Sequence, residues 1–191
     1  MKMTTLEKRF VNQPTRVHTV ANRALQLLGR IQTQAGWRYL DVGCGVGFAA
    51  SEIAGATYLE VTGVDVDPDQ VAAAKERAAR QNLRFRVMDA TALDFPDGAF
   101  DVVATSMTTH HIPEWEQAVA EMARVLRPGG YLIYSDHVFP AWLGRTFGRL
   151  VRFAGFPSAR GIHAVAAKSG LSEVWEARRF RHVDAIWAKT A

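Results

Sequence analysis

Three carboxylates stand at or beside the ends of short apolar runs that are typical of β-strands. They are Asp41, Asp65 and Asp89. In an open parallel sheet the carboxyl ends of the strands meet at one edge, and ligands bind just beyond that edge. We therefore expect the three side chains to gather at one binding site. Carboxylates placed there accept hydrogen bonds from ligand hydroxyl and amino groups, and they attract positive charge.

A glycine-rich turn follows the first of these strands. Gly43, Gly45 and Gly47 occupy alternate positions, and residues 48–54 can then form a helix. Glycine allows a positive φ and lets a ligand lie directly against the peptide units, so a strand, turn and helix of this kind favour a nucleotide-type ligand. Asp65 lies 20 residues beyond Gly45, which is about the spacing at which an acid meets the two hydroxyls of a ribose.

The same turn also fits a second ligand class. Gly45, Gly47 and Ala50 satisfy the Gly-x-Gly-x-x-Gly/Ala pattern of dinucleotide-binding proteins. A dinucleotide would place a pyrophosphate at the start of the helix, where Asp41 would repel it. A nucleoside that carries positive charge would be attracted instead. Charge therefore favours a cationic nucleoside and leaves a dinucleotide as the alternative.

Four motifs resemble, in order and spacing, those of the class I S-adenosylmethionine-dependent methyltransferases of small-molecule type. They are the glycine motif at 40–47, the second-strand acid at 63–65, the adenine loop at 88–90 and the segment 124–130 that leads into the fifth strand. The match covers residues 37–136. S-adenosylmethionine carries both an ammonium and a sulfonium. The resemblance implies that this molecule is the methyl donor and that the chain is an enzyme.

The resemblance also implies a role for individual side chains. Asp41 and the backbone of residues 43–47 would hold the methionine part, and Asp65 would hold the ribose. Asp89 would bind the adenine, and Ser106 would line the cofactor beside the transferable methyl group. The expected cofactor-binding residues are Asp41, Val42, Gly43, Cys44, Gly45, Val46, Gly47, Asp65, Val66, Asp89, Ala90 and Ser106.

Methyl transfer from a sulfonium is an in-line displacement, so the protein mainly aligns the donor with the acceptor. A general base is needed only for a hydroxyl or a protonated amine. His110 and His111 follow the fourth strand and are the candidates, with His111 preferred. The alternative is that the pair shapes the loop or packs on the cofactor without taking a proton.

The single cysteine excludes several other chemistries. Cys44 lies inside the glycine turn at a small-residue position of the motif, and we expect it to be structural. One cysteine allows neither an internal disulfide nor a Cys-x-x-Cys metal site, and we predict no metal. Residues 106–108 do not form the Asn/Asp-Pro-Pro-aromatic motif of enzymes that methylate bases or glutamine amides, so a nucleic-acid substrate is not expected.

The elements that position these residues alternate along the chain. Expected strands are residues 39–42, 58–66, 83–88, 100–105 and 131–135; expected helices start near residue 15 and cover 48–54, 68–80, 113–125 and part of 155–167. Such alternation predicts a mostly parallel sheet covered on both faces. Residues 172–179 and 182–189 have almost no linker between them and must pair antiparallel. The prediction is a Rossmann-like α/β fold with five parallel strands and a C-terminal antiparallel hairpin.

The 191 residues are expected to form one methyltransferase domain. Its parts are an N-terminal flap and helix at 1–36, a cofactor-binding core at 37–136, a basic lid-like segment and helix at 137–170, and the hairpin at 171–191. Within the third part, residues 138–156 carry basic and aromatic side chains at helical spacing. They predict a lid over the acceptor or a contact with an anionic membrane, and an ordinary covering helix is the alternative.

The composition of the chain limits the classes of molecule with which we expect it to interact. The formal net charge of +4 is too mild to imply nucleic acid, and the chain lacks an apolar run of membrane-spanning length. We expect a cytoplasmic enzyme that methylates a small, apolar or anionic molecule. A cofactor-binding protein that regulates without transferring a methyl group is the alternative, and an NAD-dependent oxidoreductase is a remote one.

Overall fold

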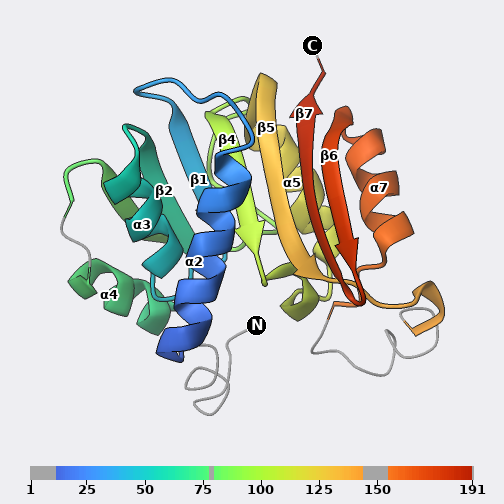
Figure 1. Ribbon diagram of the computed structural model, residues 1–191, viewed down its shortest axis with the longest axis horizontal. Helices are drawn as coiled ribbons and strands as arrows, with labels where there is room; N and C mark the ends of the chain where they lie inside the picture. Colours follow the sequence, from blue (N-terminus) through green and yellow to red (C-terminus); the bar gives the residue numbers. More distant parts are fainter. Residues whose placement is uncertain (1–11, 78–79, 144–154, 191) are drawn as a thin grey trace.

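A seven-stranded mixed sheet organises the protein, as a computed structural model that describes residues 12–77, 80–143 and 155–190 shows (Figure 1). Five strands run parallel: β1 (Arg38–Val42), β2 (Glu60–Asp65), β3 (Leu83–Val87), β4 (Phe100–Ser106) and β5 (Leu126–His137). The strands β6 (Leu171–Arg179) and β7 (His182–Lys189) form a hairpin, in which β7 runs antiparallel to both of its neighbours, β5 and β6. The strand order is β3-β2-β1-β4-β5-β7-β6, which confirms the predicted fold class.

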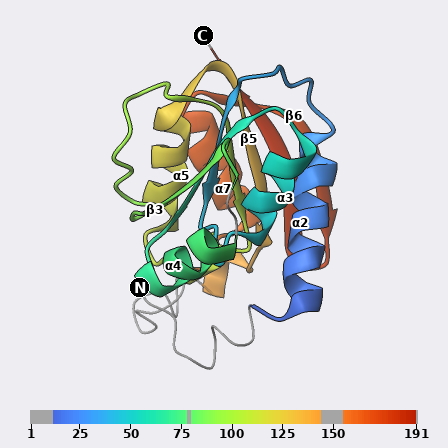
Figure 2. The same cartoon turned by 90° about the vertical axis from the view of Figure 1, so that its left-hand side faces the viewer.

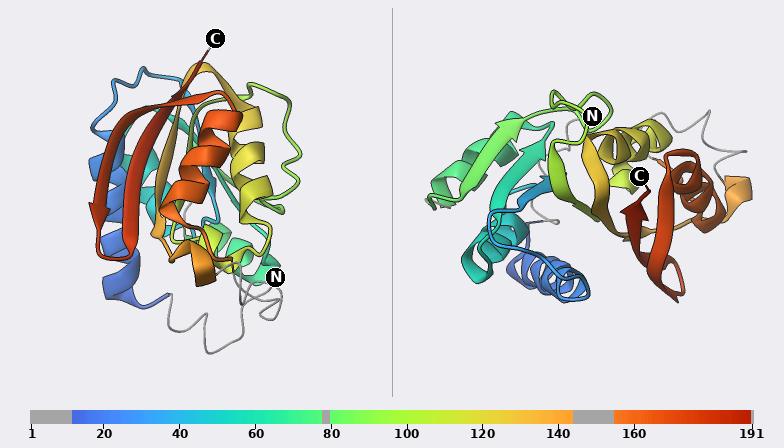
Figure 3. Two further views of the ribbon diagram at one scale, coloured as in Figure 1. Left: turned by 90° about the vertical axis from the view of Figure 1, so that its right-hand side faces the viewer. Right: turned by 90° about the horizontal axis from the view of Figure 1, so that it is seen from above.

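Helices cover both faces of this sheet (Figure 3). The helices are α2 (Pro14–Leu28), α3 (Phe48–Ala56), α4 (Pro68–Arg77), α5 (Trp115–Val125) and α7 (Ala159–Lys168), and η1 (Thr109–His111) is a short 3₁₀ turn. The first three contribute to one core cluster, whereas α5 and α7 contribute to the other. Figure 2 shows the edge of the molecule where α4 lies next to β3.

The alternation of side chains along β1 explains why two cores form. Tyr39 packs in the cluster with α2 and α3, whereas Leu40 and Val42 pack in the cluster with α5. Successive side chains of a strand point to opposite faces of the sheet. The apolar residues Tyr39, Leu40 and Val42 point to both faces, which places β1 between two layers of helices.

The fifth strand begins earlier than the sequence predicts. The sequence predicts a strand at residues 131–135, but β5 already starts at Leu126, beside Phe100 of β4. The register then shifts, because the next residue pairs join Val102 to Tyr131. The intervening segment is an irregularity inside the strand, and Gly129 has a φ of +74° there. The helix predicted at residues 113–125, in contrast, begins two residues later than expected, at Trp115.

Most of the basic, aromatic segment predicted to be a lid, residues 144–154, lies outside the described residues, so its role stays a prediction. Within the described part of the chain, no helix is long and apolar enough to cross a membrane.

Candidate functional site

A cavity of about 210 Å³ opens at the carboxyl ends of the parallel strands. Its wall includes the turn after β1, the end of β2, the segment after β3 and the loop after β4. This is the edge at which ligands of open α/β sheets bind. Ten of the twelve expected cofactor residues line it: Val42, Gly43, Cys44, Gly45, Val46, Asp65, Val66, Asp89, Ala90 and Ser106.

The glycine turn has the shape of a ligand cradle. Gly43, Gly45 and Gly47 all have positive φ, at +76°, +53° and +72°. A Cβ added at Gly43 would lie 2.2 Å from Thr108 Cγ2, so a side chain cannot fit there. A Cβ added at Gly45 would meet no atom within 4 Å, although this glycine lines the cavity. The turn is therefore closed against the protein on one side and open toward the cavity on the other, as a bound nucleoside requires.

Asp41 lies behind this wall and does not line the cavity. Its side chain is buried, with 6% of the residue exposed. Burial, together with the nearby charge of Asp65, raises the pKa of Asp41 to about 7. A positive charge on a ligand in the cavity would relieve this unfavourable environment, whereas a pyrophosphate would worsen it. Asp41 can thus select the charge of the ligand from outside the cavity.

Asp65 lines the cavity and also holds the glycine turn in place. Its Oδ2 accepts a hydrogen bond from the Gly45 N–H at 2.9 Å, and its Oδ1 accepts one from the Asp67 N–H at 2.9 Å. Burial raises the pKa of Asp65, and the two backbone hydrogen bonds oppose that rise. Asp65 therefore links the ends of the first and second strands at the site where a ribose is expected.

Asp89 has a different environment. Its Oδ1 accepts two hydrogen bonds from Thr91, one from the N–H at 2.8 Å and one from the hydroxyl at 2.7 Å. Burial would raise the pKa of Asp89, but these two bonds outweigh it and lower the pKa. The carboxylate is thus held ionised in the cavity wall, where it can accept a hydrogen bond from a ligand amino group.

The two adjacent histidines occupy different environments. His111 lines the cavity. His110 does not line it; its Nδ1 lies 2.5 Å from Oδ1 of the buried Asp136, and its ring centroid lies 4.0 Å from that of His111. The expected pair is therefore divided into one residue that reaches the cavity and one that is held behind it.

The sequence interpretation missed several residues of the site. The cavity is also lined by three residues of α2 and one residue just before that helix: Arg16, Val17, Val20 and Asn12. Asn12 Nδ2 donates to Gln70 Oε1 at 3.1 Å, which joins the N-terminal segment to α4. We expected a flap and a helix within residues 1–36, but residues 1–11 of that range lie outside the described part of the chain. Asp136 was missed as well, although it follows the same signal as the other acids, an apolar strand that ends in a carboxylate.

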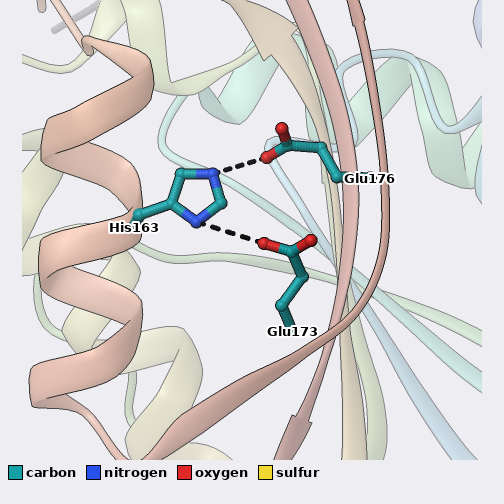
Figure 4. Close-up of side chains that lie close together, drawn as sticks. All are labelled: His163, Glu173 and Glu176. Atoms are coloured by element: carbon teal, nitrogen blue, oxygen red, sulfur yellow. Dashed lines mark hydrogen bonds and ion pairs between the residues drawn. The ribbon is translucent and has the colours of Figure 1, made fainter.

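A second cluster of ionisable groups lies between α7 and β6 (Figure 4). His163 Nε2 lies 2.5 Å from Glu176 Oε2, and His163 Nδ1 lies 3.5 Å from Glu173 Oε2. A histidine and two glutamates are a ligand set that metals use. However, the Arg178 guanidinium bonds to Glu176 and lies 3.0 Å from His163 Nε2, where a cation would have to sit. This group is better described as an ion-pair network that joins α7 to β6.

Comparison with known proteins identifies the family to which the chain is similar. Residues 40–134, about half of the chain, match the family model described as a methyltransferase domain. The chain is 40% identical over 115 residues to 27-O-demethylrifamycin SV methyltransferase of Amycolatopsis mediterranei. This alignment covers 58% of this chain and 42% of the relative. It is 36% identical over 157 residues to methyltransferase GfsG of Streptomyces halstedii. That alignment covers 76% of this chain and 56% of the relative. The chain thus spans about half the length of the curated relatives it matches.

The fold has solved counterparts. A structure of geranyl diphosphate methyltransferase in complex with S-adenosylmethionine superimposes with a TM-score of 0.76 at 15% sequence identity. The alignment covers 94% of this chain and 92% of that one. At this identity the likeness concerns the fold, including the sheet whose carboxyl edge holds the cavity.

Proposed function

The chain belongs to the class I S-adenosylmethionine-dependent methyltransferases, and from that premise we propose that it transfers a methyl group from S-adenosyl-L-methionine to a small organic acceptor. One observation carries the proposal: a glycine turn open toward a cavity that also contains two carboxylates, with a third carboxylate behind it. Asp65 and Asp89 line that cavity, and Asp41 is buried next to it. Such a site suits a ribose, an adenine and a positive charge together.

The wall residues would hold the cofactor in a fixed position. The backbone at residues 43–46 would lie against its methionine part, with the Asp41 charge attracting the ammonium. Asp65, already oriented by the Gly45 N–H, would accept hydrogen bonds from the ribose hydroxyls. Asp89 would accept one from the adenine amino group. When bound, S-adenosylmethionine supplies a methyl group already activated for displacement by its sulfonium.

The protein would then mainly align the reactants and exclude water. Alignment of this kind can contribute roughly 7 to 11 kcal/mol to lowering a barrier. His111 lines the cavity and is our candidate for the base that an acceptor hydroxyl needs. Our alternative for His111 is a role in packing against the cofactor without proton transfer.

The cavity wall also suggests a class of acceptor. Beyond the expected cofactor residues, the wall combines apolar side chains with polar and charged ones. The apolar residues are Val17, Val20, Phe48, Ala49, Val64, Met88, Met107, Ile112 and Pro113; the charged ones are Arg16, Asp67 and Glu114; the other polar ones are Asn12, Gln70, Thr91, Thr108 and His111. This lining suits a partly apolar molecule with a polar reacting group. One relative is named for a 27-O-demethylrifamycin substrate, so hydroxylated, partly apolar compounds are the first class to test.

Two other functions share some of these features. A dinucleotide would have to place a pyrophosphate near Asp41 and Asp65, whose pKa values burial already raises. We therefore place an NAD-dependent oxidoreductase well behind a methyltransferase. A protein that binds S-adenosylmethionine without transferring its methyl group would have the same cofactor site, and only turnover separates it from an enzyme.

The experiment has two stages. Isothermal titration calorimetry with S-adenosylmethionine, S-adenosylhomocysteine and NAD should show binding of the first two at one site per chain and none of NAD. Release of S-adenosylhomocysteine is then measured with a panel of phenols and aliphatic alcohols, for the wild type and for His111→Asn. NAD binding without S-adenosylmethionine binding would overturn the proposal. Turnover with any panel member would exclude the non-catalytic alternative, and unchanged turnover in His111→Asn would remove the base role.

A further inference from the structure

Asp136, the residue before the last in β5, is a buried carboxylate that does not line the cavity. It is 0% exposed. Its Oδ2 accepts hydrogen bonds from the loop after β4, namely from Thr108 N at 3.0 Å, Thr109 N at 2.6 Å, Thr109 Oγ1 at 2.7 Å and His110 N at 3.3 Å. Its Oδ1 lies 2.5 Å from His110 Nδ1 and accepts from His137 N at 2.7 Å. One side chain thus accepts hydrogen bonds from three consecutive backbone N–H groups of the loop and lies within hydrogen-bond distance of the side chains of Thr109 and His110.

The charge of this carboxylate is well supported. Burial alone would raise the pKa of Asp136, but the hydrogen bonds and the charge of His110, with the Thr109 hydroxyl, outweigh it and lower the pKa. Hydrogen bonds to a charged group are stronger than those between neutral groups. The ionised form therefore holds the loop more firmly than a neutral acceptor could.

The loop that Asp136 holds forms part of the cavity wall. Met107, Thr108 and His111 all line the cavity. Met107 has a φ of +55°, which is uncommon for a residue other than glycine and must be maintained by its surroundings. The Met107 N–H donates to Ser135 O at 2.8 Å, so β5 supports the loop at two adjacent positions.

The same loop also contacts the glycine turn. Thr108 Oγ1 lies 3.5 Å from Gly43 O, and the Thr108 side chain fills the space that a Cβ at Gly43 would need. A shift of Thr108 would therefore reach the turn against which the cofactor is expected to lie. A chain of direct contacts leads from Asp136 through Thr108 to Gly43.

We propose that Asp136 is a positioning residue, which sets the loop at residues 107–111 against the glycine turn and so preorganises the cofactor cavity from outside it. The identity of the ligand rests on the proposed function. Without this anchor the loop would have to be ordered when the ligand binds, and that ordering lowers affinity.

Replacement by asparagine tests this role with almost no change of shape. An amide has only one acceptor oxygen, and its NH₂ group must face a donor in either orientation. In one orientation it faces the N–H of His137, and in the other it faces the N–H groups of Thr108 and Thr109. Asp136→Asn therefore weakens the anchor while the volume of the side chain is kept.

The measurement is calorimetric titration of the full chain with S-adenosylhomocysteine, which reports affinity and binding-competent fraction separately. For Asp136→Asn we expect the dissociation constant to rise about tenfold or more, with stoichiometry near that of the wild type. Thr109→Val removes one donor to Asp136 and should give a smaller rise, about threefold. Hydrogen exchange should accelerate at the amides of residues 108–110 in Asp136→Asn. The control is Glu176→Gln, which alters a carboxylate of a His–Glu pair outside the cavity and should leave the affinity unchanged.

Each outcome decides the inference. If Asp136→Asn reduces only the stoichiometry or the melting temperature, and the affinity of both variants equals that of the wild type, Asp136 is structural and the inference is wrong. If Asp136→Asn does not fold, an unchanged affinity in Thr109→Val overturns it equally. If the wild type itself does not bind S-adenosylhomocysteine, the proposed function fails first, and hydrogen exchange at residues 108–110 still tests the anchor.

Discussion

Two histidine–carboxylate pairs in this protein have the same separation and opposite surroundings. His110 and Asp136 approach to 2.5 Å near the cavity, and His163 and Glu176 approach to 2.5 Å between α7 and β6. The side chains are 13% and 0% exposed in the first pair, and 28% and 13% exposed in the second. The difference lies in what else each carboxylate contacts.

The buried Asp136 takes most of its other hydrogen bonds from the backbone of a loop, whereas the partly exposed Glu176 is paired with another side chain, that of Arg178. Asp136 accepts from three loop N–H groups, but Glu176 shares its charge with Arg178. A long side chain with access to water can rearrange when a partner is lost, and a buried backbone N–H cannot. The same pair is therefore an anchor in one region and a local ion pair in the other.

We expect the largest effect when a glycine of the cavity region is replaced, compared with a glycine between α7 and β6. Gly45 and Gly170 both have positive φ, at +53° and +74°, so alanine should cost each a similar backbone strain of about 1 to 2 kcal/mol. Only the Cβ at Gly45 would project toward the cavity. We expect Gly45→Ala to weaken S-adenosylhomocysteine binding about a hundredfold, and Gly170→Ala to leave it unchanged. Calorimetry and thermal melting of both variants check this, and equal affinities would show that the turn does not cradle the ligand.

The next effect concerns the buried acid of the cavity region. Because the pKa of Asp41 is raised to about 7, binding a ligand ammonium below that pH requires loss of a proton. Affinity for S-adenosylhomocysteine should therefore rise by up to about tenfold per unit from pH 5.5 to pH 7 and then level off. Titrations at several pH values in buffers of different ionisation enthalpy would detect the released proton. In Asp41→Asn the slope should disappear, and an equal slope in this variant would assign the proton to another group.

Without ligand, the same group acts on stability in the opposite direction. A carboxyl whose folded pKa lies above its ordinary value of 3.8 stabilises the fold below about pH 4. That contribution, up to about 4 kcal/mol, is lost as the pH rises through 7. Asp41→Asn should accordingly flatten the dependence of urea unfolding on pH over this range.

The smallest effect is expected in the partly exposed pair of His163 and Glu176. Hydrogen bonds from Arg178 and His163 outweigh burial and lower the pKa of Glu176, so its contribution is present above about pH 4.5 and is lost as the pH falls. Glu176→Gln should reduce the free energy of unfolding at pH 7 by about 1 kcal/mol or less, and the difference should vanish at low pH. A loss of several kcal/mol in urea unfolding would show that this cluster anchors α7 as firmly as Asp136 is expected to anchor its loop.

Much of the fold and of the cavity could be predicted because the signals are local. The glycines after β1 have positive φ, Asp65 at the end of β2 accepts hydrogen bonds from two nearby backbone N–H groups, and the short link between the last two strands allows only antiparallel pairing. The predicted start of β5 was wrong because Pro128 and Gly129 are residues that usually interrupt regular structure. Only the pairing with β4 shows that the strand continues through an irregularity there.

The sequence by itself determined the order of the strands along the chain, the glycine turn and the family of the donor site, because these depend on residues close to one another. It did not determine that Asp41 would lie behind the cavity wall, or that His111 would line the cavity while His110 would not. Only the tertiary structure decided that Asp136 meets the loop at residues 107–111. That contact exists because β4 and β5 are neighbours in the sheet, so their carboxyl ends lie side by side. Asp136 is fully buried there and accepts hydrogen bonds from the backbone of the loop, whereas Glu176, between α7 and β6, stays partly exposed and pairs with the side chains of His163 and Arg178.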